Sequence, residues 1–357
     1  MIRARLGRYT LGIAIVVAAL ASAVGAQAAD DNVYTVTPLV TNQQDPDLVN
    51  AWGLVAGPVS PGRPNGTPWW VADNGTSLST LYNGAGVKQG LVVKVGLDVP
   101  PDSAPTGIVF NGGPGFLVSN GGPTGAAIFI FDAEDGGIYG WNPVVAGTTA
   151  VPAPIEQPPG EQIYKGLAIA NNLLFATDFH NGVVDVFNSS WDLVNQFSDP
   201  FIPRGFAPFG IQAINGNIFV TFAQQDADHE DDVAGIGLGF VDEFSTSGHL
   251  VARVAMHGLL NAPWGLAWAP GNFGKFSNDL LVGNFGDGRI NAFRQTPTGL
   301  FVPHGQLKTA SGNRIEIDGL WALQFGTGGT AGPTNSLFFT AGPNDESDGL
   351  FGKITAG

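Results

Sequence analysis

The fold is decided by residues 261–293, which read NAPWGLAWAPGNFGKFSNDLLVGNFGDGRINAF. This stretch contains apolar runs at 261–268, 279–283 and 289–293, separated by a Gly/Pro-rich connection and by the polar tip 284–288. Short apolar runs bounded by glycine, proline and asparagine predict strands, and two runs that flank a Gly-rich tip are typical of a hairpin. The stretch therefore predicts three consecutive antiparallel strands.

The same pattern recurs along the chain. A glycine opens the first run of each copy at intervals of 44 to 59 residues, at Gly53, Gly107, Gly166, Gly210, Gly265 and, more weakly, Gly319. Second runs follow at 69–72, 115–119, 173–177, 217–222, 279–283 and 336–341, and third runs at 79–82, 127–131, 183–187, 239–244, 289–293 and 349–354. Small sheets with two apolar faces bury them by packing around a common axis, so the repeats predict an all-β, six-bladed β-propeller. We expect the repeated glycines at the narrow axis, where a side chain would collide.

The two ends of the chain complement each other. Residues 33–40 alternate like a strand and precede the first repeat, whereas the last repeat ends at Ile354 without a fourth strand. We expect the N-terminal strand to complete the C-terminal blade and to close the ring. Because no linker divides the repeats, residues 29–357 are predicted to form a single domain.

Residues 1–28 are typical of an export signal. Arg3, Arg5 and Arg8 precede an apolar core at 11–24, and Ala26-Gln27-Ala28 is a small-residue cleavage site. The alternative is a transmembrane anchor, which needs about 20 apolar residues. The short core favours cleavage, so we expect a secreted or periplasmic protein. No later stretch resembles a membrane span.

The charge and the cysteine count exclude several kinds of function. The chain has 15 Lys and Arg against 30 Asp and Glu, and it has no cysteine. This charge argues against nucleic acid and anionic membranes as partners, because phosphate binding needs clustered basic residues. Thiolate chemistry, Cys-ligated zinc and disulfides are excluded. We expect a monomer that binds a small molecule, a glycan or a protein.

The polar tips between second and third strands should share one face of the propeller with the loops that enter the first strands. Asp73, Asn120, Asp178 and Asn284 lie at such tips, and their oxygens would suit calcium or magnesium better than zinc. They form the first predicted metal site, at the mouth of the central channel. The alternative is that Asn and Asp occur there because tight turns favour them.

The fourth tip expands into a long loop, residues 223–238, with five acidic residues between 226 and 232. Asp226, Asp228 and Glu230 alternate as calcium ligands do in a loop, but Asp231 stands where an EF-hand loop needs glycine. Asp226 and Asp228 are therefore a second candidate metal site, with a solvated acidic flap as the alternative. Long loops on a rigid scaffold often carry function.

Four further side chains could serve ligand binding or catalysis at the same face. His180 follows Asp178 and is the candidate general base beside a metal-bound water, with a turn histidine as the alternative. His229 is a candidate ligand-binding residue. Lys165 and Arg204 precede the first strands of the third and fourth repeats and could bind an anionic ligand, or else pair with neighbouring carboxylates.

The chain resembles the NHL-type six-bladed propellers, a group that includes gluconolactonase-like hydrolases, and it is most similar to exported bacterial propellers of unassigned function. The matching stretches are 47–54, 70–75, 105–111, 178–182, 225–228 with 239–242, and 272–288. The resemblance implies a divalent metal held by a first-blade Glu with Asn and Asp from later blades. Asn50-Ala51-Trp52 stands where that Glu is expected, while Asn120, Asp178 and Asn284 match the other ligands by position.

Two functional hypotheses follow from the sequence. The first is an exported binding or interaction module with a polar, cation-binding channel mouth and no defined catalytic activity. The second is a divalent-metal-dependent hydrolase or lyase, similar to lactonases, that acts at the central channel.

Overall fold

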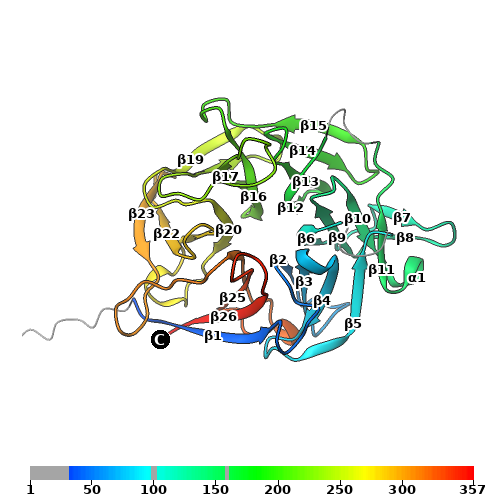
Figure 1. The fold of residues 1–357 in the computed structure, drawn as a ribbon, viewed down its shortest axis with the longest axis horizontal. Helices are drawn as coiled ribbons and strands as arrows, with labels where there is room; N and C mark the ends of the chain where they lie inside the picture. The colour runs from blue at the N-terminus through cyan, green and yellow to red at the C-terminus, as the bar shows by residue number, and fades with distance from the viewer. Residues whose placement is uncertain (1–31, 98–102, 157–160) are drawn as a thin grey trace, which may run out of the picture. The chain divides into compact units, whose positions relative to one another are not determined.

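The computed structural model describes residues 32–97, 103–156 and 161–357. The predicted export signal, residues 1–28, lies outside the described residues. The unit Asp31–Gly357 holds all the described elements, and its sheets surround a common axis (Figure 1). None of the helices in the described ranges is long and apolar enough to cross a membrane.

Four sheets have four strands each, and their first strands lie nearest the axis (Figure 1). In order of pairing, these sheets are β12 (Tyr164–Ala170), β13 (Leu173–Asp178), β14 (Val183–Asn188) and β15 (Leu193–Phe197); β16 (Phe206–Ile214), β17 (Asn217–Gln224), β18 (Phe240–Phe244) and β19 (Leu250–Met256); β20 (Pro263–Trp268), β21 (Leu280–Asn284), β22 (Ile290–Gln295) and β23 (Phe301–Gln306); and β24 (Leu320–Phe325), β25 (Ser336–Ala341), β26 (Leu350–Ala356) and β1 (Tyr34–Thr41). All their neighbouring strands are antiparallel.

An eight-stranded sheet consists of two further four-stranded units that share an outer edge. The first unit contains β2 (Ala51–Val55), β3 (Trp69–Asp73), β4 (Leu78–Tyr82) and β5 (Lys88–Val95), and the second contains β6 (Pro105–Phe110), β9 (Phe129–Ala133), β10 (Ile138–Trp141) and β11 (Thr149–Pro152). A short parallel pairing of β5 with β11 joins them. We number the units blades 1 to 6 by their first strands, β2, β6, β12, β16, β20 and β24. The prediction of an all-β propeller is confirmed.

The strand prediction for blade 2 is wrong. The run 115–119 does not pair with the first strand; it contributes β7 (Leu117–Ser119), which forms a hairpin with β8 (Thr124–Ala126). The strand that pairs with β6 is β9, and β10 follows it. An inner strand of a blade is covered on both faces, so each of its residues must be suited to burial. All residues of β9 are buried, whereas Leu117 and Ser119 in β7 are exposed.

The remaining elements are single helical turns: α1 (Pro143–Ala146), η1 (Asn74–Thr76), η2 (Gly274–Phe276) and η3 (Gly329–Ala331). The Asn142 side chain accepts a hydrogen bond from the Val144 N–H and caps α1. The low helix content agrees with the all-β fold that the sequence repeats predict.

The N-terminal strand completes the last blade, as predicted. β1 pairs with β26 from Tyr34 opposite Ala356 to Thr41 opposite Leu350. The Tyr34 hydroxyl donates a hydrogen bond of 2.9 Å to the carbonyl of Phe273, and its ring packs against Phe273 and Phe276 at centroid distances of 5.0 and 5.9 Å. The first strand of the sequence therefore ties blade 6 to blade 5.

The repeated glycines lie where the first strands of neighbouring blades meet. A Cβ added to one of them would lie 2.1 to 2.9 Å from a main-chain atom of the next blade; this applies to Gly53, Gly107, Gly166, Gly210 and Gly265. Gly319 does not belong to this set, because it precedes β24 with a φ of +62°. The equivalent residue in β24 is Ala322, since Trp321-Ala322-Leu323 matches Trp264-Gly265-Leu266. The prediction of a sixth axial glycine is wrong.

Candidate functional site

Aromatic side chains fill the axis of the propeller. Trp52, Phe209, Trp264 and Trp321 each precede the axial residue of their blade, and each is less than one tenth exposed. The rings of Trp52 and Trp321 stack with their centroids 3.6 Å apart, and those of Trp264 and Phe209 pack edge-on at 6.2 and 6.4 Å from Trp52. This cluster forms the floor of the polar mouth.

Lys165 places a buried positive charge on this floor. Its Nζ contacts Glu134 Oε1, lies 3.0 Å from Asp231 Oδ1 and lies 5.3 Å above the ring of Trp52, while its side chain is only 2% exposed. Burial lowers the pKa of the ammonium, but the carboxylates of Glu134 and Asp231 outweigh this effect and raise that pKa above its ordinary value. Lys165 is therefore charged and already paired.

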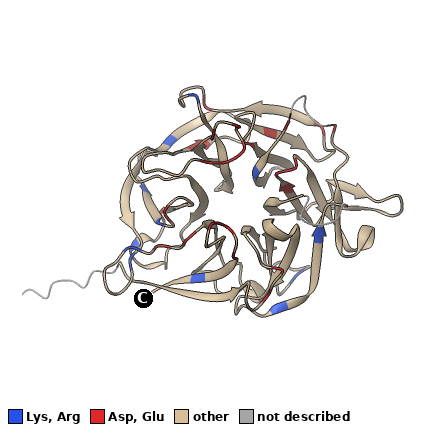
Figure 2. Ribbon diagram, in the orientation of Figure 1, with Lys and Arg blue, Asp and Glu red and all other residues tan. Residues whose placement is uncertain are grey.

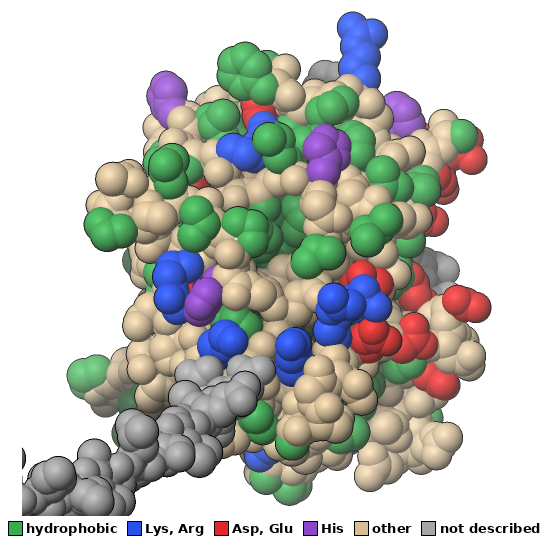
Figure 3. Space-filling model, turned by 90° about the vertical axis from the view of Figure 1, so that its left-hand side faces the viewer, with side chains coloured by type: hydrophobic (Ala, Val, Ile, Leu, Met, Phe, Trp, Pro, Cys, Tyr) green, Lys and Arg blue, Asp and Glu red, His purple; other side chains and the backbone are tan. Residues whose placement is uncertain are grey.

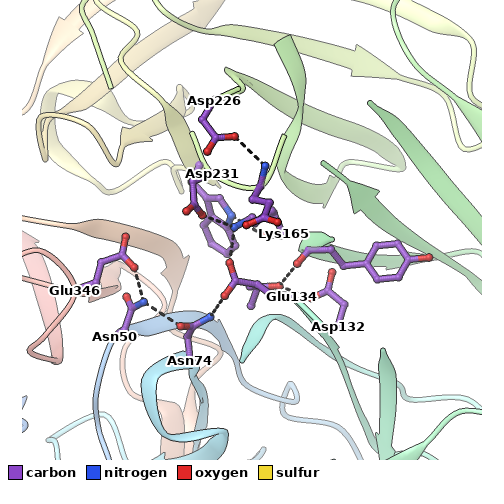
Figure 4. Close-up of polar contacts among 12 residues, drawn as sticks. Asn50, Asn74, Asp132, Glu134, Lys165, Asp226, Asp231 and Glu346 are labelled. Carbon is purple, nitrogen blue, oxygen red and sulfur yellow. Dashed lines mark hydrogen bonds and ion pairs between the residues drawn. The ribbon is translucent and has the colours of Figure 1, made fainter. Parts of the chain in front are cut away.

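A chain of amide hydrogen bonds extends from Glu134 across blades 1 and 6. Glu134 Oε2 accepts from Asn74 Nδ2 at 2.8 Å, and Asn74 Oδ1 accepts from Asn50 Nδ2 at 3.1 Å. Asn50 Nδ2 also donates to Glu346 Oε2 at 2.7 Å, and Asn50 Oδ1 accepts from Trp321 Nε1 at 3.0 Å. In Figure 4 the side chains of Asn50, Asn74, Glu134, Asp231 and Glu346 extend from Lys165 across the mouth, each within reach of the next. We call Asn50, Asn74, Glu134, Lys165, Asp231 and Glu346 the mouth network; it joins five of the six blades.

Two acidic groups, Glu346 in the mouth network and Asp232 beside it, have pKa values raised above their usual range. Burial raises the pKa of Asp232 to about 7, although the nearby Lys165 ammonium opposes this, and Asp232 Oδ2 has no hydrogen-bond partner among the described residues. Burial and the carboxylate of Glu134 raise the pKa of Glu346. Asp232 can therefore exchange a proton near neutral pH.

A cavity of about 580 Å³ lies beside Lys165. Its charged lining consists of Glu134, Asp135, Glu161, Lys165, Glu230 and Asp231. Five carboxylates thus face one ammonium that is already paired with two of them. Figure 2 shows acidic segments around the centre of the ring, whereas Lys and Arg lie mostly on the outer strands. The cavity therefore has a strongly negative potential.

Asp178 and Asn284 lie at the ends of the second strands of blades 3 and 5, and the hydrogen bonds of their side chains go to nearby turns and connections. Asn284 Oδ1 is buried and has no hydrogen-bond partner in the described chain. Both carboxylate oxygens of Asp178 accept hydrogen bonds from Asn181, at 3.1 and 2.8 Å. Burial raises the pKa of Asp178 to about 6. Asn284 Nδ2 donates to the Leu259 carbonyl and to Asp287 Oδ1, at 2.8 and 2.9 Å. Neither residue belongs to the mouth network.

Asp73 and Asn120 are not part of the mouth network either. Asp73 is fully buried, its Oδ2 accepts from the Thr80 N–H at 2.7 Å, and burial raises its pKa well above the usual range. Asn120 is exposed in the turn of the β7–β8 hairpin at the rim (Figure 1), so the prediction that it lies at the tip of blade 2 is wrong. Glu134 follows β9 and occupies that tip. The described ranges contain no group of three or more His, Asp or Glu residues arranged to hold a metal ion.

The two predicted histidines lie together, His229 in the acidic loop and His180 next to it. The ring centroids of His180 and His229 are 5.9 Å apart, and His180 Nδ1 is buried without a partner in the described chain. Asp226 Oδ1 accepts from the Glu230 N–H at 2.9 Å and so organises its own loop, while Asp228 is exposed. Arg204 is also exposed. Of the predicted cationic residues, Lys165 is the one in the mouth network, where it pairs with carboxylates.

Sequence reasoning did not assign five of the mouth residues to a site: Asn50, Asn74, Glu134, Asp231 and Glu346. Asn50 and Asn74 lie next to the predicted first strand and in the first tip. The sequence therefore predicts their approximate position, but it does not predict that their side chains contact each other. Glu134 was hidden by the wrong strand assignment in blade 2. Glu346 lies in a turn where Asn344, Asp345 and Glu346 all have positive φ values of 59°, 49° and 62°, a conformation that sequence rarely reveals.

A buried carboxyl near the network gives a pH-dependent prediction. Asp132 Oδ1 accepts from the Gly107 N–H and from Thr106 Oγ1 at 2.6 and 3.0 Å, and burial raises the pKa of Asp132 to about 7. The folded-state pKa lies above the unfolded value, so this group's contribution to stability is complete below the unfolded pKa and is lost as the pH rises through about 7. We expect Asp132→Asn to stabilise the protein, by about 2 kcal/mol more at about pH 8 than at about pH 5.

Urea unfolding of Asp132→Asn and wild type at the two pH values measures this difference directly. Asp228→Asn is the control, because Asp228 is exposed and should change the free energy of unfolding equally at both pH values. An Asp132→Asn variant whose effect is independent of pH would show that Asp132 is ionised in the folded protein.

The fold and the site define the class of protein: a β-propeller whose axis is filled by aromatic side chains beneath an acidic mouth. Sequence comparison then places it in a family. The chain is 33% identical to uncharacterized protein R648 of Acanthamoeba polyphaga mimivirus over 88% of this chain and 77% of that protein. It is 32% identical to uncharacterized protein L690 of the same virus over 90% of this chain and 85% of that protein. The chain belongs to the family of these two proteins. No family model matches it.

Solved structures show similarity in fold. The apo form of the soluble aldose sugar dehydrogenase of Escherichia coli superposes with a TM-score of 0.54 and 13% identity, over 91% of this chain and 100% of that chain. The PQQ-bound aldose sugar dehydrogenase of Streptomyces coelicolor gives a TM-score of 0.54 and 14% identity, over 90% of this chain and 98% of that chain. At this identity the comparison supports the propeller architecture alone.

Proposed function

We propose that this protein is an exported propeller of the NHL-type group that acts as a binding module, and that the acidic cavity beside Lys165 holds its ligand. The observation that carries the proposal is the excess of carboxylates over the single paired ammonium in a cavity of about 580 Å³. Ligand sites are typically concave, with a few converging polar groups and perturbed pKa values. Export is inferred from the sequence of residues 1–28.

The charge of the cavity favours a positively charged ligand. Asp135, Glu161 and Glu230 are exposed or partly exposed lining residues that Lys165 does not neutralise, and the Asp231 side chain is 75% exposed. A ligand amine or a divalent cation would gain attraction from each of these groups in a partly desolvated site. A cation could equally bind the neighbouring loop through Asp226 and Asp228, as the alternating acidic pattern suggests.

Hydrolase or lyase chemistry is the alternative, because the mouth contains a carboxylate near the place where gluconolactonase-like enzymes have a metal ligand. The resemblance expects Glu in the first blade, where Asn50 stands. Glu346 of blade 6 reaches Asn50 Nδ2 at 2.7 Å and supplies a carboxylate there. The Lys165 ammonium lies between the acidic groups that would surround a metal ion. Because it takes that place, we favour the binding module over the metal-dependent enzyme. His180 lies with His229, outside the mouth network.

The cavity does not fit PQQ, the cofactor named for the Streptomyces structure. PQQ carries several carboxylate groups and needs positively charged partners. Among the described lining residues Lys165 is the cationic one, and it is bound to Glu134 and Asp231. We therefore infer that the similarity to sugar dehydrogenases does not extend to that cofactor.

Titration calorimetry with spermidine and, separately, with calcium chloride tests the proposed ligand class. We expect at least one of these cations to bind, and the double variant Glu161→Gln/Glu230→Gln to lower its affinity about fivefold or more, because two uncompensated lining carboxylates are removed. A matched control, Asp192→Asn/Glu316→Gln, changes the net charge equally at exposed sites outside the cavity lining, and should change affinity less than about twofold.

The proposal fails if neither cation binds, or if both double variants weaken binding equally, since that would indicate attraction to the net charge alone. Turnover of a lactone or ester that needs an added divalent metal, and that is lost in Glu346→Gln, would instead establish the hydrolase alternative.

A further inference from the structure

A second cavity lies on the outer flank, between blades 4 and 5, and plays no part in the proposed function at the mouth. Its volume is about 400 Å³, and its lining includes Val254, Met256, Leu259, Phe293 and Pro303. These residues come from β19, the connection that follows it, β22 and β23. Figure 3 shows hydrophobic side chains gathered on this side of the molecule.

The inner wall of the flank cavity is part of the hydrophobic core. Val254, Leu260 and Phe293 belong to the buried cluster between blades 4 and 5. At the entrance, Met256 and Leu259 are 62% and 48% exposed. A ligand in this cavity would therefore rest on packed apolar side chains and cover apolar surface that water contacts in the free protein.

One polar group in the wall lacks a partner. Asn291 is only 3% exposed, and its Oδ1 accepts a hydrogen bond of 2.9 Å from Gln306 Nε2. Its Nδ2 is buried and has no hydrogen-bond partner in the described part of the chain. Successive strand residues face opposite sides; Ile290 and Ala292 pack into one core cluster, while Phe293 packs into the cluster beside the cavity. Asn291 shares the face of Phe293 and also lines the cavity.

A buried donor without a partner destabilises a protein, so a ligand that supplies an acceptor oxygen would recover part of that lost free energy. The charge of the cavity indicates whether this oxygen is neutral or anionic. Arg253 lines the cavity, but its guanidinium is bound to the carboxylates of Asp199 and Asp242. Arg253 therefore adds no net positive charge to the cavity, and a carboxylate ligand would gain little from it. His257 also lines the cavity, and its Nδ1 lies 2.8 Å from the Gly237 carbonyl oxygen.

We propose that the flank cavity binds a small, neutral, apolar molecule, and that a carbonyl oxygen of this molecule accepts a hydrogen bond from Asn291 Nδ2. The volume suits a molecule of about drug size or smaller. The apolar walls supply affinity, and the amide fixes the orientation of the ligand.

Fluorescence titration with Prodan, a neutral naphthalene that carries one ketone, tests this proposal on the full chain. Prodan emission reports both the polarity around the dye and hydrogen bonding to its ketone. We expect saturable binding with blue-shifted emission. Ala255→Phe places a ring in the cavity and should weaken binding about tenfold or more, because Ala255 lines it. The matched control is Ala213→Phe, since Ala213 is also partly buried and lines a separate cavity.

The role of the Asn291 amide is tested by comparing the affinities of two dyes, Prodan and its ketone-free analogue, for the wild type and for Asn291→Leu. Loss of one neutral hydrogen bond is expected to weaken Prodan binding about fivefold in Asn291→Leu, while the same naphthalene without the ketone should bind wild type and variant equally. Absence of saturable binding, equal weakening by Ala255→Phe and Ala213→Phe, or equal effects of Asn291→Leu on the two dyes would overturn the proposal. The phenylalanine variants keep the test decisive if Asn291→Leu does not fold.

Discussion

Gly210→Ala is expected to destabilise the propeller by more than about 3 kcal/mol or to prevent folding. A Cβ at this position would lie 2.1 Å from the carbonyl oxygen of Trp264 in the next blade. The clash is with main chain rather than with a side chain that can rotate, so blade 4 and blade 5 would have to separate. Because the interior is close-packed, such a shift would disturb the aromatic cluster at the axis as well. Urea unfolding followed by tryptophan fluorescence measures the loss.

Two other glycines provide graded controls for Gly210→Ala. Gly90 in β5 has open space around its Cβ position, with no atom of the described chain within 4 Å, so Gly90→Ala should change the free energy of unfolding by less than about 1 kcal/mol. Gly166→Ala should be intermediate, since its Cβ would lie 2.9 Å from the Phe209 carbonyl oxygen. If Gly210→Ala and Gly90→Ala unfold at the same urea concentration, close contact between first strands does not explain the repeated glycine.

These contacts explain why the architecture could be predicted from the sequence. Each blade needs a residue without a side chain where the first strands converge. Glycine meets this requirement in five blades, and the five glycines can be recognised in the sequence alone. The prediction failed where the requirement is relaxed, at Ala322, and where an extra apolar hairpin, β7 with β8, imitates the spacing of a blade strand. Composition does not distinguish a strand covered on both faces from a hairpin at the rim.

The site was harder to predict, because its contacts join residues that share no pattern. Lys165 could be assigned to the mouth from its place before an axial glycine, but its partners come from the turns of blades 2 and 4. Asn50 meets Glu346 across 296 positions of sequence. Turn composition marks such residues as polar and exposed, and it does not determine which way each side chain rotates. This is why the four predicted metal ligands were plausible by position, and yet the side-chain hydrogen bonds of Asp178 and Asn284 go to nearby turns and connections and not to the mouth network.

Lys165→Met should be the most damaging substitution at the mouth. It removes the charge that compensates Glu134 and Asp231 while keeping most of the apolar stem over Trp52. Removing one partner of a buried ion pair typically destabilises by about 3 to 5 kcal/mol, and the 75% exposure of the Asp231 side chain places the expected loss near 3 kcal/mol. Lys88→Met is the control: Lys88 also bridges two carboxylates, but its side chain is 35% exposed, and its loss should destabilise by about 1 kcal/mol or less.

The pH dependence and the response to cations separate this electrostatic effect from a loss of packing. In Lys165→Met the carboxylates repel one another most when all are ionised, so the loss should be larger at about pH 8 than at about pH 5, where Asp232, with a pKa of about 7, is protonated. The double variant Lys165→Met/Glu134→Gln removes one of the repelling charges and should recover part of the stability. Calcium should stabilise Lys165→Met more than wild type, because an added cation can take over the compensation that the ammonium provides. A loss that is independent of pH, unchanged by Glu134→Gln and insensitive to calcium would mean that Lys165 supports the mouth by packing against Trp52 alone.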